Sequence, residues 1–155
     1  MIQIREALES DTHIIKEMDR DVVVFVASLD SAKDLIEVQK RHNEVFDRWY
    51  SLKDQRVFLA FDEQRPLVPV GFIWIVNNTE QFTGISYCFV MDLSIVKEYR
   101  RKGIGKMLIN KAIEYTKGLG FNRIKLMVNS KNKNALRFYR QIGFDVEDLY
   151  MTKKI

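Results

Sequence analysis

The chain has 155 residues, of which 46% are hydrophobic, 30% charged and 12% aromatic. This length and composition predict one globular domain over residues 1–155 and exclude a disordered or collagen-like chain. The single cysteine, Cys88, excludes an intrachain disulfide and a cysteine-rich zinc site. The two histidines, His13 and His42, are far apart in the sequence, so we expect no metal.

The net charge is +4, from 25 basic and 21 acidic residues that are interspersed along most of the chain. Such a mild balance predicts no nucleic-acid partner. The N-terminus lacks the pattern of a signal peptide, and the longest apolar run, residues 22–26, is too short to span a membrane. We therefore expect a cytoplasmic protein with no membrane partner.

The first elements are a strand and a helix. The partial alternation over residues 3–7 predicts the strand, and Ser10 or Asp11 can cap the helix, which we expect to end near Met18. Residues 22–26 are rich in β-branched side chains, which favour a strand, but they lie between two helical patterns. We interpret them as a helical or irregular segment.

A second helix can be capped by Asp30 or Ser31 and is expected to run to about Leu52. Its apolar side chains recur at steps of three and four and form one stripe: Leu35, Val38, His42, Val45, Phe46 and Trp49.

Three strands follow, over residues 56–61, 71–76 and 85–96. The connections at residues 62–66 and 77–81 are rich in polar residues and are expected to be loops. Sequential strands with short connections predict an antiparallel meander.

The hydrophobic period changes at Gly103, where a helix begins that the glycines in 118–120 end. We expect a strand at residues 124–128, a short helix at 132–142 and one or two strands within 144–153. The predicted order, β-α-α-β-β-β-α-β-α-β(-β), defines an α+β (mixed α/β) fold.

The sequence RRKGIG at residues 100–105 separates the long strand from the helix that follows it. A helix N-terminus has unpaired N–H groups and a positive dipole end, so it attracts anions. Glycines there allow the backbone to approach a phosphate, and the motif matches neither a P-loop nor a dinucleotide fingerprint. A tight turn with solvated basic side chains explains the hexapeptide alone equally well.

A second pattern follows about twenty residues later, N-x-x-A-x-x-x-Y-x-x-x-G-F, beginning at Asn132 and ending at Phe144. Together the two patterns resemble the GNAT superfamily of N-acetyltransferases over residues 91–144. The resemblance implies a central, mixed but mostly antiparallel sheet, with splayed parallel strands flanking the helix that binds coenzyme A. It also implies transfer of the acetyl group of acetyl-CoA to a primary amine by direct attack in a ternary complex.

The resemblance further implies which residues hold acetyl-CoA. The amides of the glycine turn would bind its pyrophosphate, and the open edge of the preceding strand would pair with the pantetheine arm. Asn132 would contact the cofactor and Ala135 would allow its close approach, although a helix N-cap and ordinary packing explain these two residues equally well. The full set is Leu93, Ser94, Ile95, Arg100, Arg101, Lys102, Gly103, Ile104, Gly105, Lys106, Asn132 and Ala135.

Tyr139 matches the general acid of the family, which would protonate the departing thiolate. Helical spacing alone favours a core aromatic at this position. The position where related enzymes carry a glutamate base is Met91, which cannot accept a proton. Asp92 is the nearest replacement, although strand alternation would place it on the opposite face of the sheet from Met91. A water relay with His42 or Tyr87 is the other option.

The expected acceptor is a small amine, an amino acid, an antibiotic, or the N-terminus or a lysine of a protein. Its choice is assigned to residues 22–52 and the loop at 77–84. A CoA-binding sensor or regulatory module that has lost catalysis is the alternative, which Met91 favours and Tyr139 opposes. A homodimer is compatible with either function.

Overall fold

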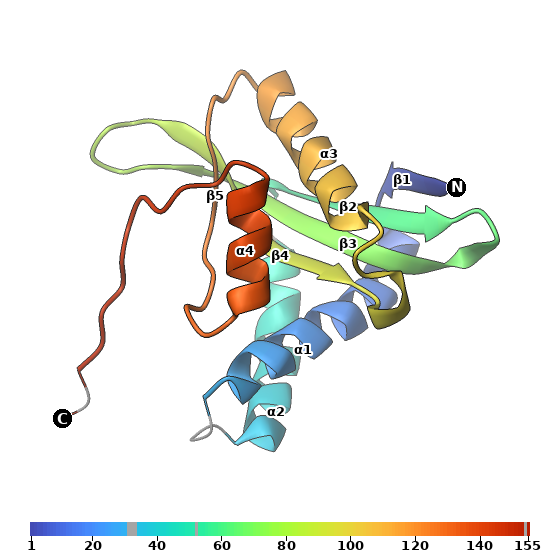
Figure 1. Ribbon diagram of the computed structural model, residues 1–155, viewed down its shortest axis with the longest axis horizontal. Helices are drawn as coiled ribbons and strands as arrows, with labels where there is room; N and C mark the ends of the chain where they lie inside the picture. Colours follow the sequence, from blue (N-terminus) through green and yellow to red (C-terminus); the bar gives the residue numbers. More distant parts are fainter. Residues whose placement is uncertain (31–33, 52, 154) are drawn as a thin grey trace.

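The computed structural model describes residues 1–30, 34–51, 53–153 and 155. Strands and helices alternate along the chain as an α+β fold (Figure 1). In chain order the elements are β1 (Ile2–Glu6), η1 (Glu9–Asp11), α1 (Thr12–Ser28), α2 (Leu35–Tyr50), β2 (Gln55–Asp62), β3 (Arg65–Thr79), β4 (Ser86–Ile95), η2 (Lys97–Tyr99), α3 (Ile104–Gly118), β5 (Ile124–Leu126) and α4 (Lys133–Gln141).

The sheet has the strand order β1-β2-β3-β4-β5, and neighbouring strands are antiparallel except for β4 and β5. These two are parallel and pair over three residue pairs, from Cys88–Ile124 to Val90–Leu126. Their pairing ends at Val90 and Leu126, although β4 continues to Ile95. The predicted mixed, mostly antiparallel sheet with splayed parallel strands is therefore confirmed.

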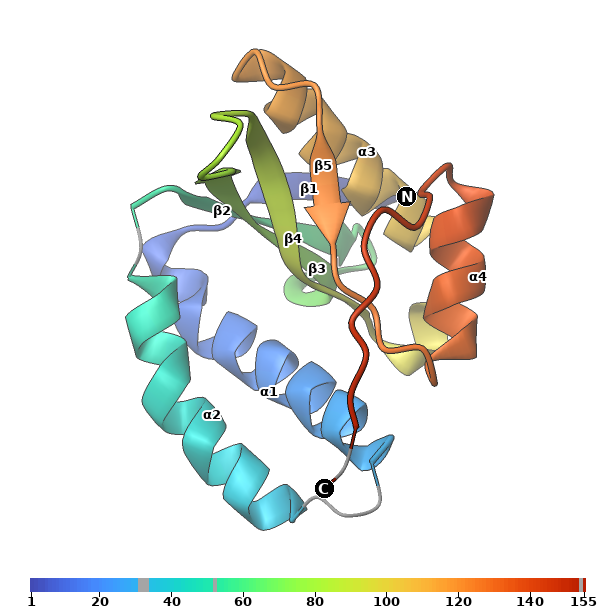
Figure 2. The same ribbon diagram turned by 90° about the vertical axis from the view of Figure 1, so that its left-hand side faces the viewer.

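Strand alternation divides the core between the two faces of the sheet. On one face α1 and α2 pack through Ile15 and Phe46 against the cluster that contains Phe72 and Trp74. On the other face α3 packs against Phe58, Ala60, Ile73, Ile75 and Val90, and side chains of α4 lie at the border of this cluster. Figure 2 shows α1 and α2 on one side of the strands and α3 and α4 on the other.

The structure corrects the predicted ends of both N-terminal helices. Helix α1 continues through residues 22–26 to Ser28, because strand propensity is a weak preference that an uninterrupted helix overrides. Helix α2 begins later than expected, at Leu35, where the Asp34 side chain accepts hydrogen bonds from two backbone N–H groups. The alternative cap Ser31 and the expected end at Leu52 lie outside the described residues.

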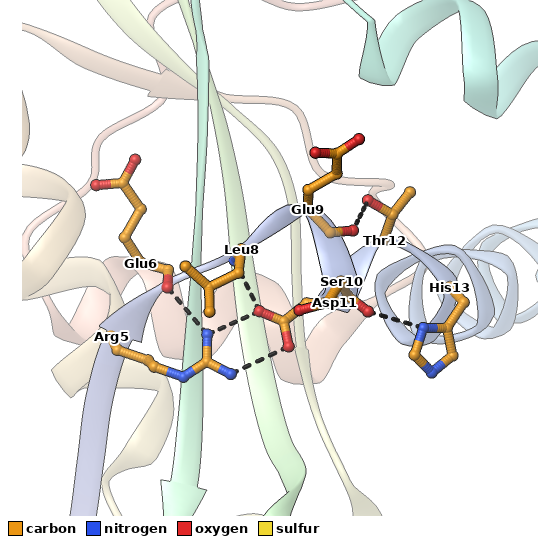
Figure 3. A network of polar contacts seen from close by, with 8 residues as sticks. All are labelled: Arg5, Glu6, Leu8, Glu9, Ser10, Asp11, Thr12 and His13. Carbon is orange, nitrogen blue, oxygen red and sulfur yellow. Dashed lines mark hydrogen bonds and ion pairs between the residues drawn. The ribbon is translucent and has the colours of Figure 1, made fainter.

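Asp11 does not cap α1 with its side chain but joins the helix to β1 (Figure 3). Its carboxylate accepts two hydrogen bonds from the Arg5 guanidinium, at 2.7 and 3.0 Å, and one from the Leu8 N–H at 2.7 Å. The hydrogen bonds from Arg5 lower the pKa of Asp11, so this junction is charged at neutral pH. It fixes the direction in which α1 leaves the sheet edge.

The predicted C-terminal strands are wrong: residues 144–153 form no strand in the described chain. Side chains hold this segment beside β5 instead, since Glu147 pairs with Lys125 at 2.6 Å and with Arg123 at 3.3 Å. Alternation predicted strands there, but no ladder forms with β5. Strand β3 also extends beyond the predicted 71–76 at both ends, so the loops expected at residues 62–66 and 77–81 are shorter than predicted.

None of the helices in the described ranges combines the length and apolar character that crossing a bilayer requires.

Candidate active site

The functional site is built where β4 parts from β5. The antiparallel ladder passes from Ile75–Val90 to Trp74–Asp92, so Met91 is the extra residue of a β-bulge. A bulge turns the residues that follow it to the other face of the sheet. Met91 packs against the cluster beneath α1 and α2, and Asp92, opposite Trp74, faces α1 as well. The expectation that Met91 and Asp92 point to opposite faces is therefore wrong.

The glycine turn, residues 100–105, leads into the N-terminus of α3. Gly103, the residue before the helix, has φ +82°, and Arg101 adopts φ +61°, which a side chain with a Cβ rarely does. Left-handed residues in such a turn direct successive N–H groups to one side and create an anion-binding concavity. Arg100, Arg101, Lys102 and Lys106 are exposed around it, whereas Ile104 is buried in the core.

The edge of β4 toward β5 is open after Val90 within the part of the chain that the structure describes. Leu93, Ser94 and Ile95 lie along this edge and are half-buried. Gly71 supports them from β3, because a Cβ there would lie 2.6 Å from Ile95 Cδ1 and 2.9 Å from the Ser94 carbonyl oxygen. The Arg100 Nε donates to the Ile95 carbonyl at 2.9 Å and ties the turn to the strand.

Helix α4 brings the second motif to the same place. Asn132 caps the helix, with its Oδ1 accepting from the Ala135 N–H at 3.2 Å. Tyr139 packs at the border of the α3 cluster, with its ring centroid 5.2 Å from that of Phe138 and 5.7 Å from that of Phe144. Burial, and secondly the negative charge of Asp92, raise the pKa of Tyr139 to about 12.

Asp92 is buried and belongs to a polar cluster beneath the bulge. Its Oδ1 accepts from the Leu93 N–H at 2.8 Å, and its carboxyl forms a side-chain hydrogen bond with Asp19 of α1. Burial and the neighbouring Asp19 raise the pKa of Asp92 well above its usual range. A raised pKa favours the protonated form of the carboxyl.

The other candidates from the sequence lie in different surroundings. His42 is buried in α2, and its Nε2 lies 2.6 Å from Asp19 Oδ2. Tyr87 is half-buried, and the Lys125 ammonium lies 5.1 Å from its ring centroid. Cys88 is buried and burial raises its pKa, which suits packing rather than nucleophilic attack.

Sequence reasoning missed Asp19. This residue lies four positions after Ile15, on the buried face of α1, and is 7% exposed. A carboxylate on an apolar helix stripe was the available signal, because charged residues are almost never fully buried without a partner.

We expect the Asp92→Asn variant to show whether Asp92 is protonated in the folded protein. A carboxyl with a raised folded pKa stabilises the fold below its usual pKa, near ~4, and this contribution is lost as pH rises to the folded pKa. Between these two pKa values, ionisation of this carboxyl alone increases the equilibrium constant for unfolding of the wild type by about tenfold per pH unit. The amide cannot ionise, so melting curves between pH 5 and pH 9 should be flatter for the variant. Parallel curves would show that Asp92 is already ionised.

An open strand edge, a glycine turn before a helix and the tyrosine-bearing helix α4 lie together where the pairing of β4 with β5 ends. The family model described as "Acetyltransferase (GNAT) family" matches residues 24–144, and the chain belongs to that family. The predicted family is thus confirmed.

Several known proteins are similar to this chain. An uncharacterized N-acetyltransferase of Methanocaldococcus jannaschii is 30% identical over 127 residues, which cover 76% of this chain and 54% of that protein. The thialysine N-epsilon-acetyltransferase of Mus musculus is 26% identical over 91% of this chain and 82% of its own length. A putative acetyl transferase from Pyrococcus furiosus superposes with a TM-score of 0.86 at 27% identity, with both chains fully covered. The chain spans about half the length of the first curated relatives that it matches.

Proposed function

We propose that this protein is an N-acetyltransferase that transfers the acetyl group of acetyl-CoA to a primary amine. The observation that carries the proposal is the open edge of β4, which Arg100 ties to the glycine turn, while Phe138 of α4 packs against Gly105 of that turn. A relative of this fold, an aminoglycoside acetyltransferase at 14% identity and TM-score 0.69, is described in complex with a CoA-linked bisubstrate analogue. The proposed co-substrate fits the exposed basic residues and backbone groups of the site.

Each part of the cofactor has a counterpart in the site. Backbone N–H groups from Arg101 to Lys106, with the surrounding cations, would hold the pyrophosphate. The two amides of the pantetheine arm would pair with the edge at residues 93–95, as an added strand does. Asn132 and Ala135 would line the arm from α4. The thioester would then lie at the splay, near the bulge and Tyr139.

Tyr139 is proposed as the general acid. Its hydroxyl stays protonated through the physiological range, because burial, and the charge of Asp92 when that carboxyl is ionised, raise the pKa of Tyr139 to about 12. In the step that expels the thiolate, the phenol gives its proton to sulfur. The raised pKa of Asp92 favours its protonated form, so we assign the removal of the acceptor's ammonium proton to solvent rather than to this carboxyl.

The acceptor is proposed to enter from the α1–α2 side. A cleft of about 490 Å³ lies there, lined by Trp49 of α2, by residues 53–54, by residues 76–78 of β3, and by Tyr87, Phe89 and Met91 of β4. This volume suits a small ligand. The cleft joins the two segments, 22–52 and 77–84, to which acceptor choice is assigned.

The proposed function is tested by release of the CoA thiol with a panel of amines. L-Ornithine and thialysine are included because relatives from Arabidopsis thaliana and Mus musculus are named for them, and an aminoglycoside and a peptide complete the panel. We expect thiol release that depends on one class of amine. A protein that binds acetyl-CoA but acetylates none of these classes would support the regulatory module that Met91 favours.

Acetyl-CoA is expected to stabilise the fold before any acceptor is added. A ligand that binds the native state at 100 times its Kd adds about 2.7 kcal/mol to the free energy of unfolding. Thermal melting with and without saturating acetyl-CoA measures this effect. Adenosine serves as a control because it lacks the pyrophosphate and the pantetheine arm. An unchanged melting temperature would argue against the cofactor site.

A further inference from the structure

The proposed acceptor cleft follows β4 to the point where that strand leaves β5. Tyr87, Phe89 and Met91 line the cleft and, as alternate residues of the strand, lie on the same face of the sheet. The last pair between β4 and β5 is Val90–Leu126, so Met91 is the first residue beyond the pairing. At about 3.3 Å per residue, the four steps from Met91 back to Tyr87 span ~13 Å. One end of the cleft therefore reaches the reaction centre, and Tyr87 lies toward the other end.

The lining between these two ends is mainly apolar. Val76 of β3 is the register partner of Phe89 and widens the floor. Trp49 of α2 forms a wall and is 45% exposed, while Tyr87, Phe89 and Met91 are half-buried. Apolar surface of this kind gains free energy when a ligand removes it from water, and aromatic side chains contribute the largest areas. The floor and wall therefore favour a ligand with an apolar body.

The charged groups at the cleft lie beside charges of the opposite sign. Among the described residues, the charged side chains in the lining are Lys53 and Asp54, which are neighbours in the chain and are both exposed. The Lys125 ammonium lies 5.1 Å from the ring centroid of Tyr87 and pairs with Glu147 at 2.6 Å, so the protein already supplies a cation to this ring. A second ammonium on the acceptor would exchange its hydration for an apolar floor, which costs free energy.

Resting on the proposed acetyl transfer, we propose that the acceptor is a primary amine on an apolar body, either an aliphatic chain or an aromatic ring. The body extends from Met91 toward Tyr87, and Trp49 and Phe89 contact it and determine specificity. The acceptor ammonium first loses one proton to solvent, and the nitrogen then forms its bond to the acetyl carbon. The C–S bond breaks with its electron pair on sulfur, which takes the Tyr139 proton, and the second proton of the nitrogen restores the phenol through solvent.

The first test compares n-hexylamine with cadaverine, which has the same number of non-hydrogen atoms but ends in a second ammonium. We expect kcat/KM to be at least about tenfold higher for n-hexylamine, because the cleft has to desolvate the second charge of cadaverine. From n-butylamine to n-hexylamine, kcat/KM should rise by about fourfold for each methylene, as for a CH₂ removed from water. The absence of this trend, or a preference for cadaverine, L-ornithine or a peptide, would overturn the proposal.

The second test is Trp49→Ala, which removes the wall while alanine preserves the helix. We expect KM for n-hexylamine to rise at least about tenfold, the loss that 1.4 kcal/mol of binding free energy corresponds to. Acetyl-CoA affinity should be retained, because α2 packs on the opposite face of the sheet from α3. Leu67→Ala is the matched control, since Leu67 is 92% exposed and lies at the other end of β3 from the cleft. An unchanged KM in Trp49→Ala would refute its contact with the acceptor.

The third test reverses the preference. Asn78 is the register partner of Tyr87 and lines the cleft, and its Oδ1 accepts from the Thr79 N–H at 2.8 Å. Asn78→Asp keeps this acceptor and adds a negative charge, so the preference for n-hexylamine over cadaverine should fall by about threefold, the effect of an exposed ion pair. Asn110→Asp, exposed on α3, is its control and should keep the wild-type preference. An unaltered preference in Asn78→Asp would show that the acceptor does not extend to this end.

Failure of the acceptor class can be distinguished from failure of the proposed function. If Trp49→Ala does not fold, the amine series and Asn78→Asp decide the proposal. If the wild type acetylates no amine, the proposed function fails, and thermal melting with each amine then decides what the cleft binds. In that case n-hexylamine should raise the Tm more than cadaverine at equal concentration, and Trp49→Ala should remove the difference. Equal shifts, or none, would overturn the apolar class.

Discussion

Tyr139→Phe is expected to lower kcat by roughly 10²–10⁴-fold, the range typical of a lost general acid. The variant loses one hydroxyl and keeps the ring, which packs against Phe138 and Phe144, so the fold should be retained. Acetyl-CoA affinity should change little, because the proposed contacts with pyrophosphate and pantetheine belong to other residues. Steady-state kinetics with an accepted amine measure the loss.

Tyr115→Phe is the matched control for this variant. Tyr115 lies on α3, is also half-buried and packs edge-to-face on Phe58, but it is remote from the second motif in the sequence. Its kcat should equal that of the wild type. If kcat also stays unchanged in Tyr139→Phe, with chemistry shown to be rate-limiting, Tyr139 is a packing residue and the sulfur takes its proton from solvent.

Gly103→Val is expected to weaken acetyl-CoA binding by at least about tenfold. Gly103 has φ +82°, and a residue with a Cβ pays roughly 1–2 kcal/mol to adopt the left-handed conformation, more when it is β-branched. Either the turn keeps its shape at that cost or its N–H groups rotate away from the pyrophosphate. About 1.4 kcal/mol corresponds to tenfold in Kd. Isothermal titration with acetyl-CoA measures the change.

Gly118→Val, at the other end of the same helix, separates loss of the site from loss of the helix. A Cβ at Gly118 meets nothing within 4 Å among the described residues, and its backbone is helical. This control should bind acetyl-CoA as the wild type does. If Gly103→Val and Gly118→Val both fold and bind acetyl-CoA with equal affinity, the pyrophosphate does not bind at the glycine turn.

Sequence periodicity located most elements because they depend on local spacing. The stripe of α2 and the change of period at Gly103 are examples, and both lie where the pattern indicates. Periodicity failed where a distant contact decides. Residues 144–153 form ion pairs instead of a ladder. The run at residues 22–26 is helical, as one of its two interpretations had it, but the end of the first helix was predicted ten residues too early. A strand needs a partner, and the sequence of one segment does not state whether the partner forms hydrogen bonds with it.

The sequence by itself determined the family, the glycine turn and the candidacy of Tyr139, since each depends on residue types at fixed short spacing. The tertiary structure alone decided the surroundings of Asp92. One extra residue in β4 turns its side chain toward α1, where it meets Asp19, 73 positions earlier in the chain, and through it His42. Neither a bulge nor a long-range contact leaves a mark in local periodicity, and burial among these partners is what raises the pKa of the carboxyl.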